Sequence, residues 1–343
     1  MKLTDVQNDQ QLWECMTEPT DALMEFSARM PEPVVVLGGS GKMGRELTGM
    51  LRRADEAAGI QRKITVASTF SNPDDKTQLE SQGIETMQGD LGDEAFLDTL
   101  PDLSLVIYML GFKFGSSQDF RRTFHLNAVT PYLVGRKYSN ARIVMFSSGN
   151  FYPRLLPDHG GCREASEITP NGVYGWSLVA RESAFSTTAL QSPNQQVCMY
   201  RLMYAQHLCY GVLVDLAKMI QNDEPISLAI PAVNLVSQRD ANDVALRSLE
   251  YTANPPSILN IGGSVVSVRD VCEQLGLLLG HTPTFIEPEG ETALLANDEL
   301  SQEMYGPYRD SVEDLIQSVA RWVQRDGTYW NKPTKFGVVN HAY

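Results

Sequence analysis

The segment Val34-Val35-Val36-Leu37-Gly38-Gly39-Ser40-Gly41-Lys42-Met43-Gly44 determines how the chain begins its fold. Its four apolar residues predict a short buried strand, and the apolar periodicity of residues 43–57 predicts a helix directly after it. Glycines at positions 38, 41 and 44 join the two with a GxxGxxG spacing. A sharp turn from a strand into a closely packed helix requires residues without a Cβ atom. The segment therefore predicts the first strand–turn–helix unit of an α/β domain.

Strands and helices alternate over most of the remaining sequence. The expected strands are 34–37, 63–68, 84–88, 103–110, 142–146, 197–202 and 257–261. The expected helices are 43–57, 93–100, 118–139, 174–191, 212–221, 240–251 and 268–280. Such alternation is typical of βαβ units with a parallel sheet covered on both faces. We therefore expect an α/β protein with a doubly wound parallel sheet, a Rossmann-type domain, and a smaller mixed C-terminal domain.

Three regions are expected along the chain. Residues 1–32 form an N-terminal helical extension, in which Thr20 is placed to cap a helix that ends before Pro31. Residues 33–204 form the Rossmann domain, to which residues about 233–263 return. Residues 205–343 mainly form a substrate-binding domain that covers the ligand cleft.

The composition excludes several classes of protein. A net charge of −14 disfavours binding to nucleic acid and to anionic membrane surfaces, both of which are recognised by basic residues. The sequence contains no run of about 18 apolar residues and begins with no signal-peptide apolar region. Its five cysteines are scattered without a CxxC pair, which disfavours a zinc site or a disulfide framework. We expect a cytoplasmic protein that binds no metal, no nucleic acid and no membrane.

The glycine-rich turn predicts a binding site for the pyrophosphate of a dinucleotide. Free N–H groups and the positive end of the helix dipole favour phosphate at a helix N-terminus, and a turn without Cβ atoms lets phosphate approach the backbone. The residues expected to bind lie in the turn itself: Gly38, Ser40, Gly41, Lys42, Met43 and Gly44. A glycine turn without a ligand is the alternative, because such motifs also occur by chance.

The residues after the next two strands bear on which dinucleotide binds. An acidic residue at the end of the second strand would select NAD through its ribose 2′-OH, but residues 66–69 include none. Lys42 is compatible with a 2′-phosphate, although no arginine stands at the strand end to hold one. Ser68, Asp90 and Leu91 are expected beside the adenosine half, and Asp90 has a helix cap as its alternative role. We expect NAD or NADP, with a slight preference for NADP.

Further motifs follow in a fixed order over about residues 34–322. They are Gly89-Asp90-Leu91, Asn127-Ala128-Val129, Ser147-Ser148-Gly149, Tyr174-Gly175-Trp176-Ser177, Arg201 and Asn260-Ile261-Gly262-Gly263. Together with the glycine turn, this order resembles the extended short-chain dehydrogenase/reductase class, the NAD-dependent epimerase/dehydratase family. The resemblance implies a Rossmann fold, a cofactor-binding Asn127, a small-molecule substrate and a homodimer formed through helices 118–139 and 174–191.

The family carries out its chemistry with a serine, a tyrosine and a lysine four residues after the tyrosine. Ser148 and Tyr174 stand at the first two positions, but the third is Leu178. The resemblance implies that Tyr174 acts as acid/base at a hydroxyl or carbonyl oxygen, which Ser148 orients. A free tyrosine titrates near pH 10, so a tyrosine that works as a base at neutral pH needs a nearby cation.

Two residues are candidates for this missing cation. Lys113, between Phe112 and Phe114 at the ligand-facing end of the fourth strand, is expected to be the third catalytic residue. An ordinary surface lysine is its alternative role. Arg181 is expected to lie too far away, because it follows Tyr174 by about two helical turns, or ~10 Å.

The leading hypothesis is an enzyme, an NAD(P)-dependent oxidoreductase or epimerase that acts on a carbohydrate-like hydroxyl or keto group. Sugar-nucleotide members of the family usually carry an asparagine three residues after the arginine that follows the sixth strand, whereas Arg201 is followed by Leu202-Met203-Tyr204. This departure favours a smaller sugar, sugar acid or polyol-like compound. The alternative, favoured by Leu178, is a catalytically silent dinucleotide-binding protein that acts as a sensor or scaffold.

Overall fold

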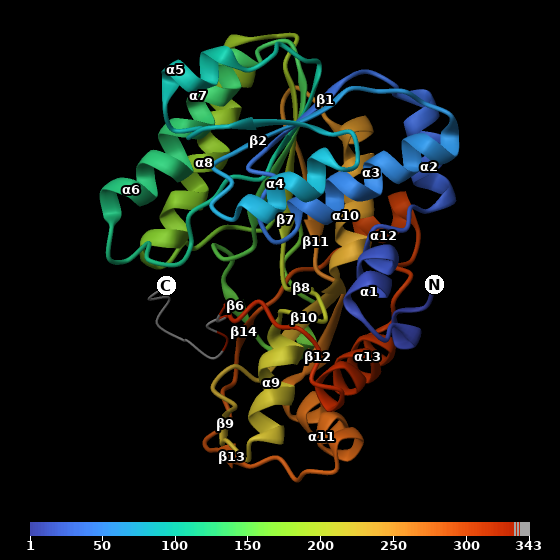
Figure 1. Ribbon diagram of the computed structural model, residues 1–343. Helices are drawn as coiled ribbons and strands as arrows, with labels where there is room; N and C mark the ends of the chain where they lie inside the picture. The colour runs from blue at the N-terminus through green and yellow to red at the C-terminus, as the bar shows by residue number, and fades with distance from the viewer. Residues whose placement is uncertain (333, 335, 337–343) are drawn as a thin grey trace.

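The central element of the molecule is a parallel sheet of seven strands. A computed structural model describes residues 1–332, 334 and 336, and Figure 1 shows the sheet in its upper half. The strand order is β11-β7-β5-β4-β1-β2-β3, and each neighbouring pair is parallel. The strands are β1 (Val34–Leu37), β2 (Ile64–Ser68), β3 (Glu85–Gln88), β4 (Leu105–Tyr108), β5 (Arg142–Ser148), β7 (Gln196–Leu202) and β11 (Ser257–Ile261). The order reverses direction between β1 and β4, which confirms the doubly wound Rossmann-type fold.

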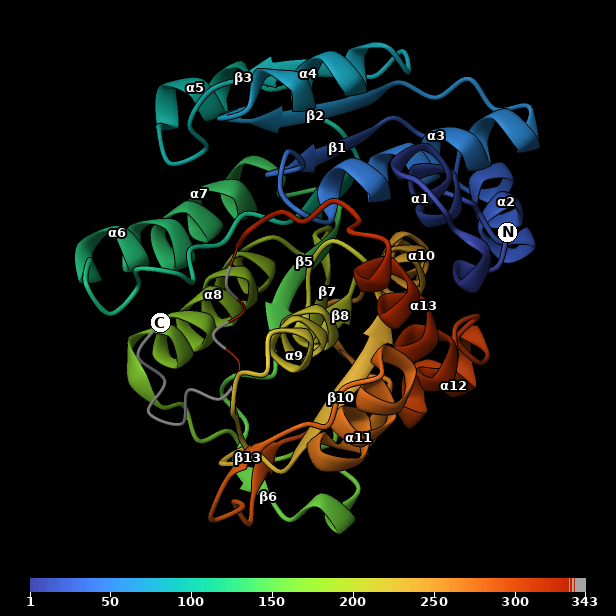
Figure 2. The same cartoon turned by 60° about the horizontal axis from the view of Figure 1, so that its bottom comes forward.

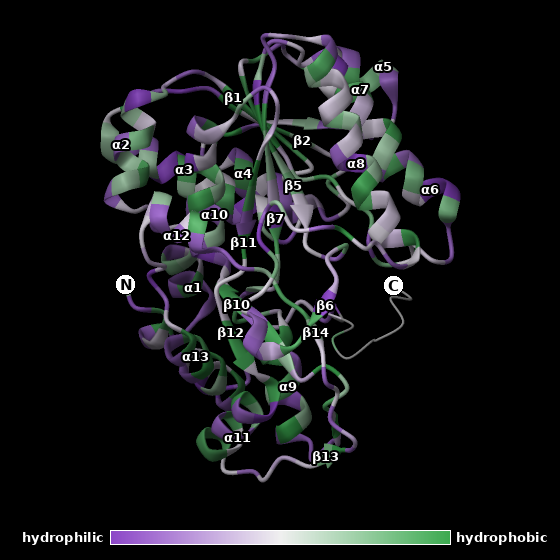
Figure 3. Cartoon of the chain, turned by 180° about the vertical axis from the view of Figure 1, so that it is seen from behind, coloured by the Kyte–Doolittle hydropathy of each residue, from purple (hydrophilic) through white to green (hydrophobic). Residues whose placement is uncertain are grey.

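Helices cover both faces of this sheet. One face carries α2 (Asp21–Arg29), α3 (Gly44–Ala58), α4 (Pro73–Glu80) and α10 (Gln238–Arg247), and the other carries α5 (Glu94–Thr99), α6 (Phe120–Phe124), α7 (Thr130–Lys137) and α8 (Gly172–Gln191). The residues of β1 are all apolar because the strand is covered on both faces. Val34 and Val36 lie in the core beneath α3, whereas Val35 and Leu37 lie in the core beneath α7 and α8. Figure 3 shows these central strands as hydrophobic, with hydrophilic stretches on the surrounding helices.

The helix predicted over residues 118–139 is interrupted. It consists of α6, a single π-helical turn at His125–Val129, and α7. Pro131 lacks the N–H that would bond to the carbonyl of Asn127, and the N–H of Thr130 reaches back to His125 instead. The helix widens at this point, where Asn127 projects toward the sheet and is completely buried.

A second, smaller part of the molecule lies below the sheet in Figure 1. It is built around a three-stranded sheet, β8 (Ala205–Gln206), β10 (Ala232–Ser237) and β12 (Ser264–Ser267). Whereas α12 (Glu299–Tyr305) packs against β11 of the large sheet, the helices of this smaller part are α1 (Asp9–Met16), α9 (Val212–Gln221), α11 (Val268–Leu279) and α13 (Val312–Gln324). Two short strand pairs complete it, β6 (Arg154–Leu155) with β14 (Ala293–Leu294), and β9 (Ile226–Ser227) with β13 (Phe285–Ile286). Single 3-10 turns occur at Leu3–Asp5, Pro157–His159 and Ser248–Tyr251.

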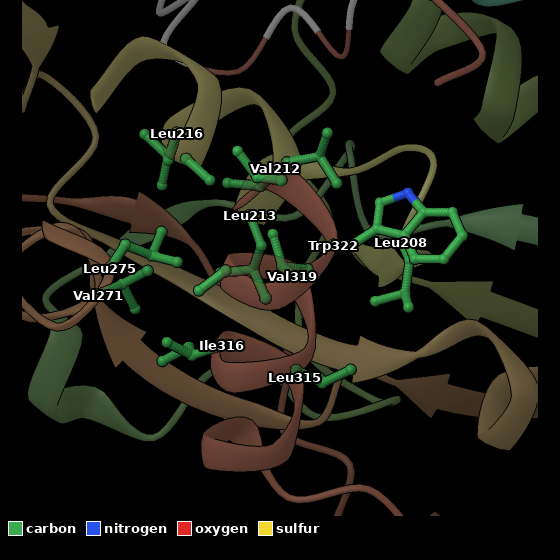
Figure 4. Close-up of a cluster of buried hydrophobic side chains, with 14 of the residues drawn as sticks. Leu208, Val212, Leu213, Leu216, Val271, Leu275, Leu315, Ile316, Val319 and Trp322 are labelled. Atoms are coloured by element: carbon green, nitrogen blue, oxygen red, sulfur yellow. The ribbon is translucent and has the colours of Figure 1, made fainter. Parts of the chain in front are cut away.

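The core of this smaller part joins distant segments of the chain. Figure 4 shows side chains of α9, α11 and α13 meeting, among them Leu213, Leu275 and Val319. The N-terminal segment contributes Leu12 and Met16 from α1 to the same cluster. Trp322 lies at its edge, nearly inaccessible to solvent.

The N-terminal extension serves both parts, because α1 packs into the lower core and α2 packs on α3. Of residues about 233–263, α10 and β11 return to the large sheet, whereas β10 belongs to the small one. The expected C-terminal domain includes residues 333, 335 and 337–343, which lie outside the described residues. Within the part that is described, no helix has the length and apolarity to cross a membrane.

Candidate functional site

The glycine turn adopts the geometry that its sequence predicts. Gly38 has a φ of +83°, and a Cβ atom there would lie 2.8 Å from the backbone nitrogen of Leu110. A Cβ atom on Gly44, the first residue of α3, would lie 2.4 Å from the carbonyl oxygen of Gly39. These two glycines are therefore required by the turn and by the helix–strand packing. Gly41 is different, since a Cβ atom there would meet only the Gly38 oxygen, at 3.5 Å.

The N-terminus of α3 presents its amides at the carboxyl edge of the sheet. Met43 is the N-cap residue, and no described side chain accepts a hydrogen bond from the first turn as a cap. Next to it, the hydroxyls of Ser40 and Ser68 lie 2.6 Å apart and connect the turn to the end of β2. This arrangement of helix end, glycine turn and strand edge is suited to binding a diphosphate.

The remaining predicted cofactor residues lie along the same edge. Leu91 is buried and Asp90 is exposed just beyond β3. Asp90 accepts a hydrogen bond from the N–H of Gly92, but it does not cap α5, because Asp93 fills that role. The alternative prediction that Asp90 caps this helix was therefore wrong.

Lys42 points away from β2. Its ammonium lies 3.4 Å from the centroid of the Tyr210 ring and 5.2 Å from that of Phe114. Phe114 follows β4, which flanks β1 on the side opposite β2. Lys42 is thus not directed toward the strand end at which a 2′-phosphate would be recognised.

Tyr174 and Ser148 come together at the end of β5. Tyr174 lies in the first turn of α8, is almost entirely buried, and forms a hydrogen bond with the half-buried Ser148. Burial raises the pKa of Tyr174, while the Arg181 guanidinium and the hydrogen bond with Ser148 act in the opposite direction. The balance keeps the phenol protonated at neutral pH in the cofactor-free protein.

Asn127 connects the elements around this pair. Its amide pairs with both backbone groups of Phe112, accepting from the N–H at 2.9 Å and donating to the oxygen at 2.8 Å. It also donates to the hydroxyl of Ser177, at 2.9 Å, and that hydroxyl donates to the carbonyl of Tyr174. Asn127 therefore fixes the loop after β4 against the first turn of α8.

Two cations lie near Tyr174. The ammonium of Lys113 lies 5.6 Å from the centroid of the Tyr174 ring. Arg181 is buried and donates to the carbonyl of Phe146, at 3.0 Å, and to the Asn127 side chain. The expectation that Arg181 is too distant was wrong, because its side chain runs back along α8 toward the helix start. Leu178, at the family's lysine position, is completely buried in the apolar cluster around Phe151.

Sequence reasoning missed two further features of the site. Tyr210, whose ring packs against the ammonium of Lys42, is not among the predicted site residues. The segment after α13 was expected only as part of a mixed domain, yet its Trp330 stacks on His207, and Figure 2 shows this segment leaving α13 and running toward α8. No short motif marks either position. Among the described residues, no group of three or more His, Cys, Asp or Glu side chains is arranged to hold a metal ion.

Comparison with solved structures identifies many proteins with this fold. The UDP-glucose 4-epimerase of Thermotoga maritima, solved with UDP-glucose, has a TM-score of 0.70 at 15% identity, covering 86% of this chain and 99% of that one. The UDP-glucuronic acid 4-epimerase of Bacillus cereus, solved with UDP-glucuronic acid and NAD, has a TM-score of 0.68 at 14% identity over 85% and 99% of the two chains. The dTDP-glucose 4,6-dehydratase of Bacillus anthracis, solved with NAD, has 0.70 at 15% identity over 86% and 97%. No family model and no curated protein sequence matches the chain.

The fold is thus that of the NAD-dependent sugar-nucleotide epimerases and dehydratases. At these identities the likeness establishes the architecture alone.

Proposed function

We propose that this protein is an NAD-dependent oxidoreductase or epimerase that acts on a hydroxyl or keto group of a carbohydrate-like substrate. The observation that carries the proposal is the convergence, at one edge of the sheet, of a free helix N-terminus behind a glycine turn and a buried Tyr174–Ser148 pair. Ligands of open α/β sheets bind at this edge, where the strand order reverses. The structural neighbours bind NAD and sugar nucleotides in the same architecture.

Each residue has a defined task in this proposal. The backbone amides of residues 41–44 hold the pyrophosphate, and Ser40 and Ser68 face the adenosine half. A bound nicotinamide supplies the hydride acceptor or donor. Tyr174 exchanges a proton with the reacting oxygen while Ser148 holds that oxygen by a hydrogen bond. Asn127 keeps the loop after β4 in position.

NAD replaces the slight preference for NADP. That preference depended on Lys42, which packs on Tyr210 and Phe114 instead of facing the end of β2. Ser68 and Ser40 offer hydroxyl groups to a ribose and supply no charge to a 2′-phosphate. Discrimination of the two cofactors therefore depends on neutral hydrogen bonds.

Lys113 is proposed to assist Tyr174 electrostatically. An opposite charge a few ångströms away favours the phenolate, and oxidised nicotinamide adds a second positive charge when bound. Lys113→Met is expected to raise the apparent pKa of Tyr174, and with it the rising limb of the pH–rate profile, by about one pH unit, because one nearby charge typically moves a pKa by about that much or more. Activity should fall much more at pH 7 than at pH 9.5.

The measurement is a kcat/KM profile of both proteins between pH 6 and pH 10. Lys113→Arg should recover part of the loss, since a planar guanidinium replaces a compact ammonium imperfectly. Lys76→Met on α4, whose lysine pairs with Glu80, serves as the control. A Lys113→Met profile parallel to that of the wild type would remove Lys113 from the reaction.

A homodimer is proposed through the outer surface of α8. Trp176, Val179, Ser183, Ser186 and Leu190 follow one another at alternating spacings of three and four, which places them along one stripe of the helix. Trp176 is 57% exposed and Leu190 83% exposed, and a groove of about 560 Å³ runs beside them.

We expect the double substitution Trp176→Glu with Leu190→Glu to convert the dimer into a monomer, because it places carboxylates in an apolar interface. Light scattering after size exclusion measures the mass. Leu277→Glu on α11, which changes a leucine that is 85% exposed in the other part of the molecule, should have no effect. A wild-type protein that is monomeric at micromolar concentrations would refute this assembly.

A catalytically silent dinucleotide-binding protein remains the second candidate. It is favoured by Leu178 at the lysine position and by the raised pKa of Tyr174. This candidate predicts dinucleotide binding without turnover, so the substitution of Tyr174 discussed below separates the two.

A further inference from the structure

Arg181 is a buried cation that has no acidic partner in the described part of the chain. It lies on α8, and only 4% of its surface is exposed. The carboxylate next to it in the sequence, that of Glu182, is bound by Arg201 in a bidentate ion pair and by the hydroxyl of Ser147. Buried charges are normally paired, because burial removes the water that would stabilise them. The burial of Arg181 without such a partner therefore requires an explanation.

The guanidinium of Arg181 is held in one place. One of its nitrogens donates to the carbonyl of Phe146, at 3.0 Å, and another donates to the side-chain oxygen of Asn127, at 2.5 Å. A Cβ atom on Gly111 would lie 2.8 Å from the guanidinium, so this glycine leaves the space that the guanidinium occupies. The third nitrogen, Nε, is buried and forms no hydrogen bond with a described residue. The cation is therefore fixed while part of its capacity to donate is unused.

Both contacts of this guanidinium lead to Tyr174. Phe146 lies two residues before Ser148 on β5, and Ser148 forms a hydrogen bond with the Tyr174 side chain. Asn127 donates to the hydroxyl of Ser177, at 2.9 Å, and this hydroxyl donates to the carbonyl of Tyr174, at 2.7 Å. The guanidinium is thus connected both to the backbone of Tyr174 and to the strand end that binds its phenol.

Tyr174 also shares one face of α8 with Arg181, because the two are seven residues apart. Burial raises the pKa of Tyr174, and the charge of Arg181 lowers it. The other groups around the phenol are Lys113, whose ammonium lies 5.6 Å from the ring centroid, and Tyr210. Burial raises the pKa of Tyr210, and also that of Tyr108 beside Arg181, so both phenols stay neutral. Tyr174 can supply the missing anion once it loses its proton.

We infer that Arg181 is a positioning residue whose counterion is the phenolate of Tyr174. The inference deepens the proposed function and rests on it. When Tyr174 donates its proton to a keto oxygen whose carbon accepts a hydride, a hydroxyl group forms on the substrate and the phenolate is left beside a guanidinium already in place. The hydride comes from the reduced dinucleotide. A charge that is fixed before the reaction needs no reorganisation when the proton moves. In the reverse direction the same charge favours the ionised phenol that accepts the proton.

The test measures the ionisation of the Tyr174 phenol alone, without cofactor or substrate. Tyr174 is replaced by difluorotyrosine, whose fluorines lower the pKa of the phenol, and fluorine NMR follows the titration. Arg181→Gln removes the charge and keeps an amide donor for the Asn127 oxygen, whereas Arg181→Lys keeps the charge and loses the planar fork. The pKa of the phenol should rise by about one unit or more in Arg181→Gln and stay within about half a unit of the wild type in Arg181→Lys.

Asn127→Asp provides an independent variant that keeps Arg181. The new carboxylate takes the place of the amide oxygen that already accepts from the guanidinium, so it gives the buried cation an acidic partner. Because the positive charge is then compensated, the pKa of the phenol should again rise by about one unit. Arg136→Gln, which removes an exposed arginine from α7, is the matched control and should leave the titration unchanged. If Arg181→Gln does not fold, Asn127→Asp decides the inference.

The active enzyme offers a second readout in its pH–rate profile. Arg181→Gln should lower kcat/KM about tenfold at pH 7, the equivalent of one pKa unit, and the loss should become smaller as the pH rises. Arg181→Lys should retain most of the activity at both values. The affinity for NAD, measured by calorimetry, should stay within about threefold of the wild type in both variants.

The inference would be overturned if the phenol titrates alike in the wild type and in Arg181→Gln. Equal shifts in Arg181→Lys and Arg181→Gln would also overturn it, since Arg181 would then act only through its hydrogen bonds, and so would an unchanged titration in Asn127→Asp. If the protein binds NAD but turns over no substrate, the proposed function fails. The titration of the phenol in cofactor-free protein still decides whether Arg181 is the partner of Tyr174.

Discussion

Tyr174→Phe is expected to lower turnover by about 10²–10⁴, the usual contribution of a positioned acid or base. The substitution removes one oxygen from a buried ring that forms a hydrogen bond with Ser148. The phenylalanine ring fills the same space, so folding and cofactor binding should be almost unchanged. Ser148→Ala should act in the same direction with a smaller effect, because a hydrogen bond is lost and the proton donor remains.

The assay requires a panel of sugar phosphates, nucleoside diphosphate sugars, sugar acids and their keto forms, followed at the absorbance of reduced nicotinamide. Tyr251→Phe, at the 3-10 turn that precedes β11, controls for the loss of a phenol elsewhere. A Tyr174→Phe variant with full activity would exclude Tyr174 from the mechanism. A wild-type protein that binds NAD but turns over no member of the panel would favour the silent dinucleotide-binding protein.

The sequence was sufficient to predict the large sheet. The central strands are apolar because both of their faces are covered, as in β1, where alternate side chains enter two different cores, whereas the edge strand β3 is polar and partly exposed. Such strands alternate with helices along the sequence, and each of these elements can be predicted from its own residues. The strands of the smaller part are short, and a pair such as β6 and β14 is only two residues long on each side. A strand of two residues is too short to show a hydrophobic periodicity in the sequence.

The candidate site was predictable where it lies in a motif. Gly38, Gly44, Ser148 and Tyr174 stand at fixed spacings, and the structure brings them to one sheet edge. Arg181 was judged from the rise of the helix alone, which places its Cα two turns away. The long side chain of Arg181 extends toward the N-terminus of α8, however, and its guanidinium therefore comes near Tyr174.

The direction of the Lys42 side chain illustrates a different limit. Its ammonium packs on Phe114 and Tyr210, which belong to two other segments of the chain. No local pattern encodes such a contact. Lys42 was therefore predicted as a residue of the turn, with no indication of the direction of its side chain.

Gly41→Val is expected to abolish dinucleotide binding while the protein remains folded. The Cβ atom would meet only the carbonyl oxygen of Gly38, at an ordinary 3.5 Å, and Gly41 has no positive φ to strain. The two added methyl groups would occupy the outer face of the turn, where the pyrophosphate approaches the backbone. We expect a loss of affinity of about 100-fold or more, equivalent to about 2.7 kcal/mol.

Two further glycine substitutions show whether the loss of binding is specific to Gly41. Gly44→Ala should destabilise the fold itself, because its Cβ atom would lie 2.4 Å from the Gly39 oxygen. Gly59→Ala, at the left-handed C-terminus of α3, faces open space and has no contact with the turn. Gly59→Ala should lower the free energy of unfolding by about 1 kcal/mol, because alanine disfavours the positive φ of this position. It should leave the affinity for the dinucleotide unchanged. Thermal unfolding measured with and without NAD separates these effects.

The central claim is that the glycine turn binds a nicotinamide dinucleotide, and calorimetric titration of the wild type and Gly41→Val with NAD and NADH tests it most directly. The account predicts one binding site per chain in the wild type and no measurable binding by a Gly41→Val protein of unchanged unfolding temperature. Absence of binding of either dinucleotide to the wild type at millimolar concentration, or equal binding to both proteins, would contradict it.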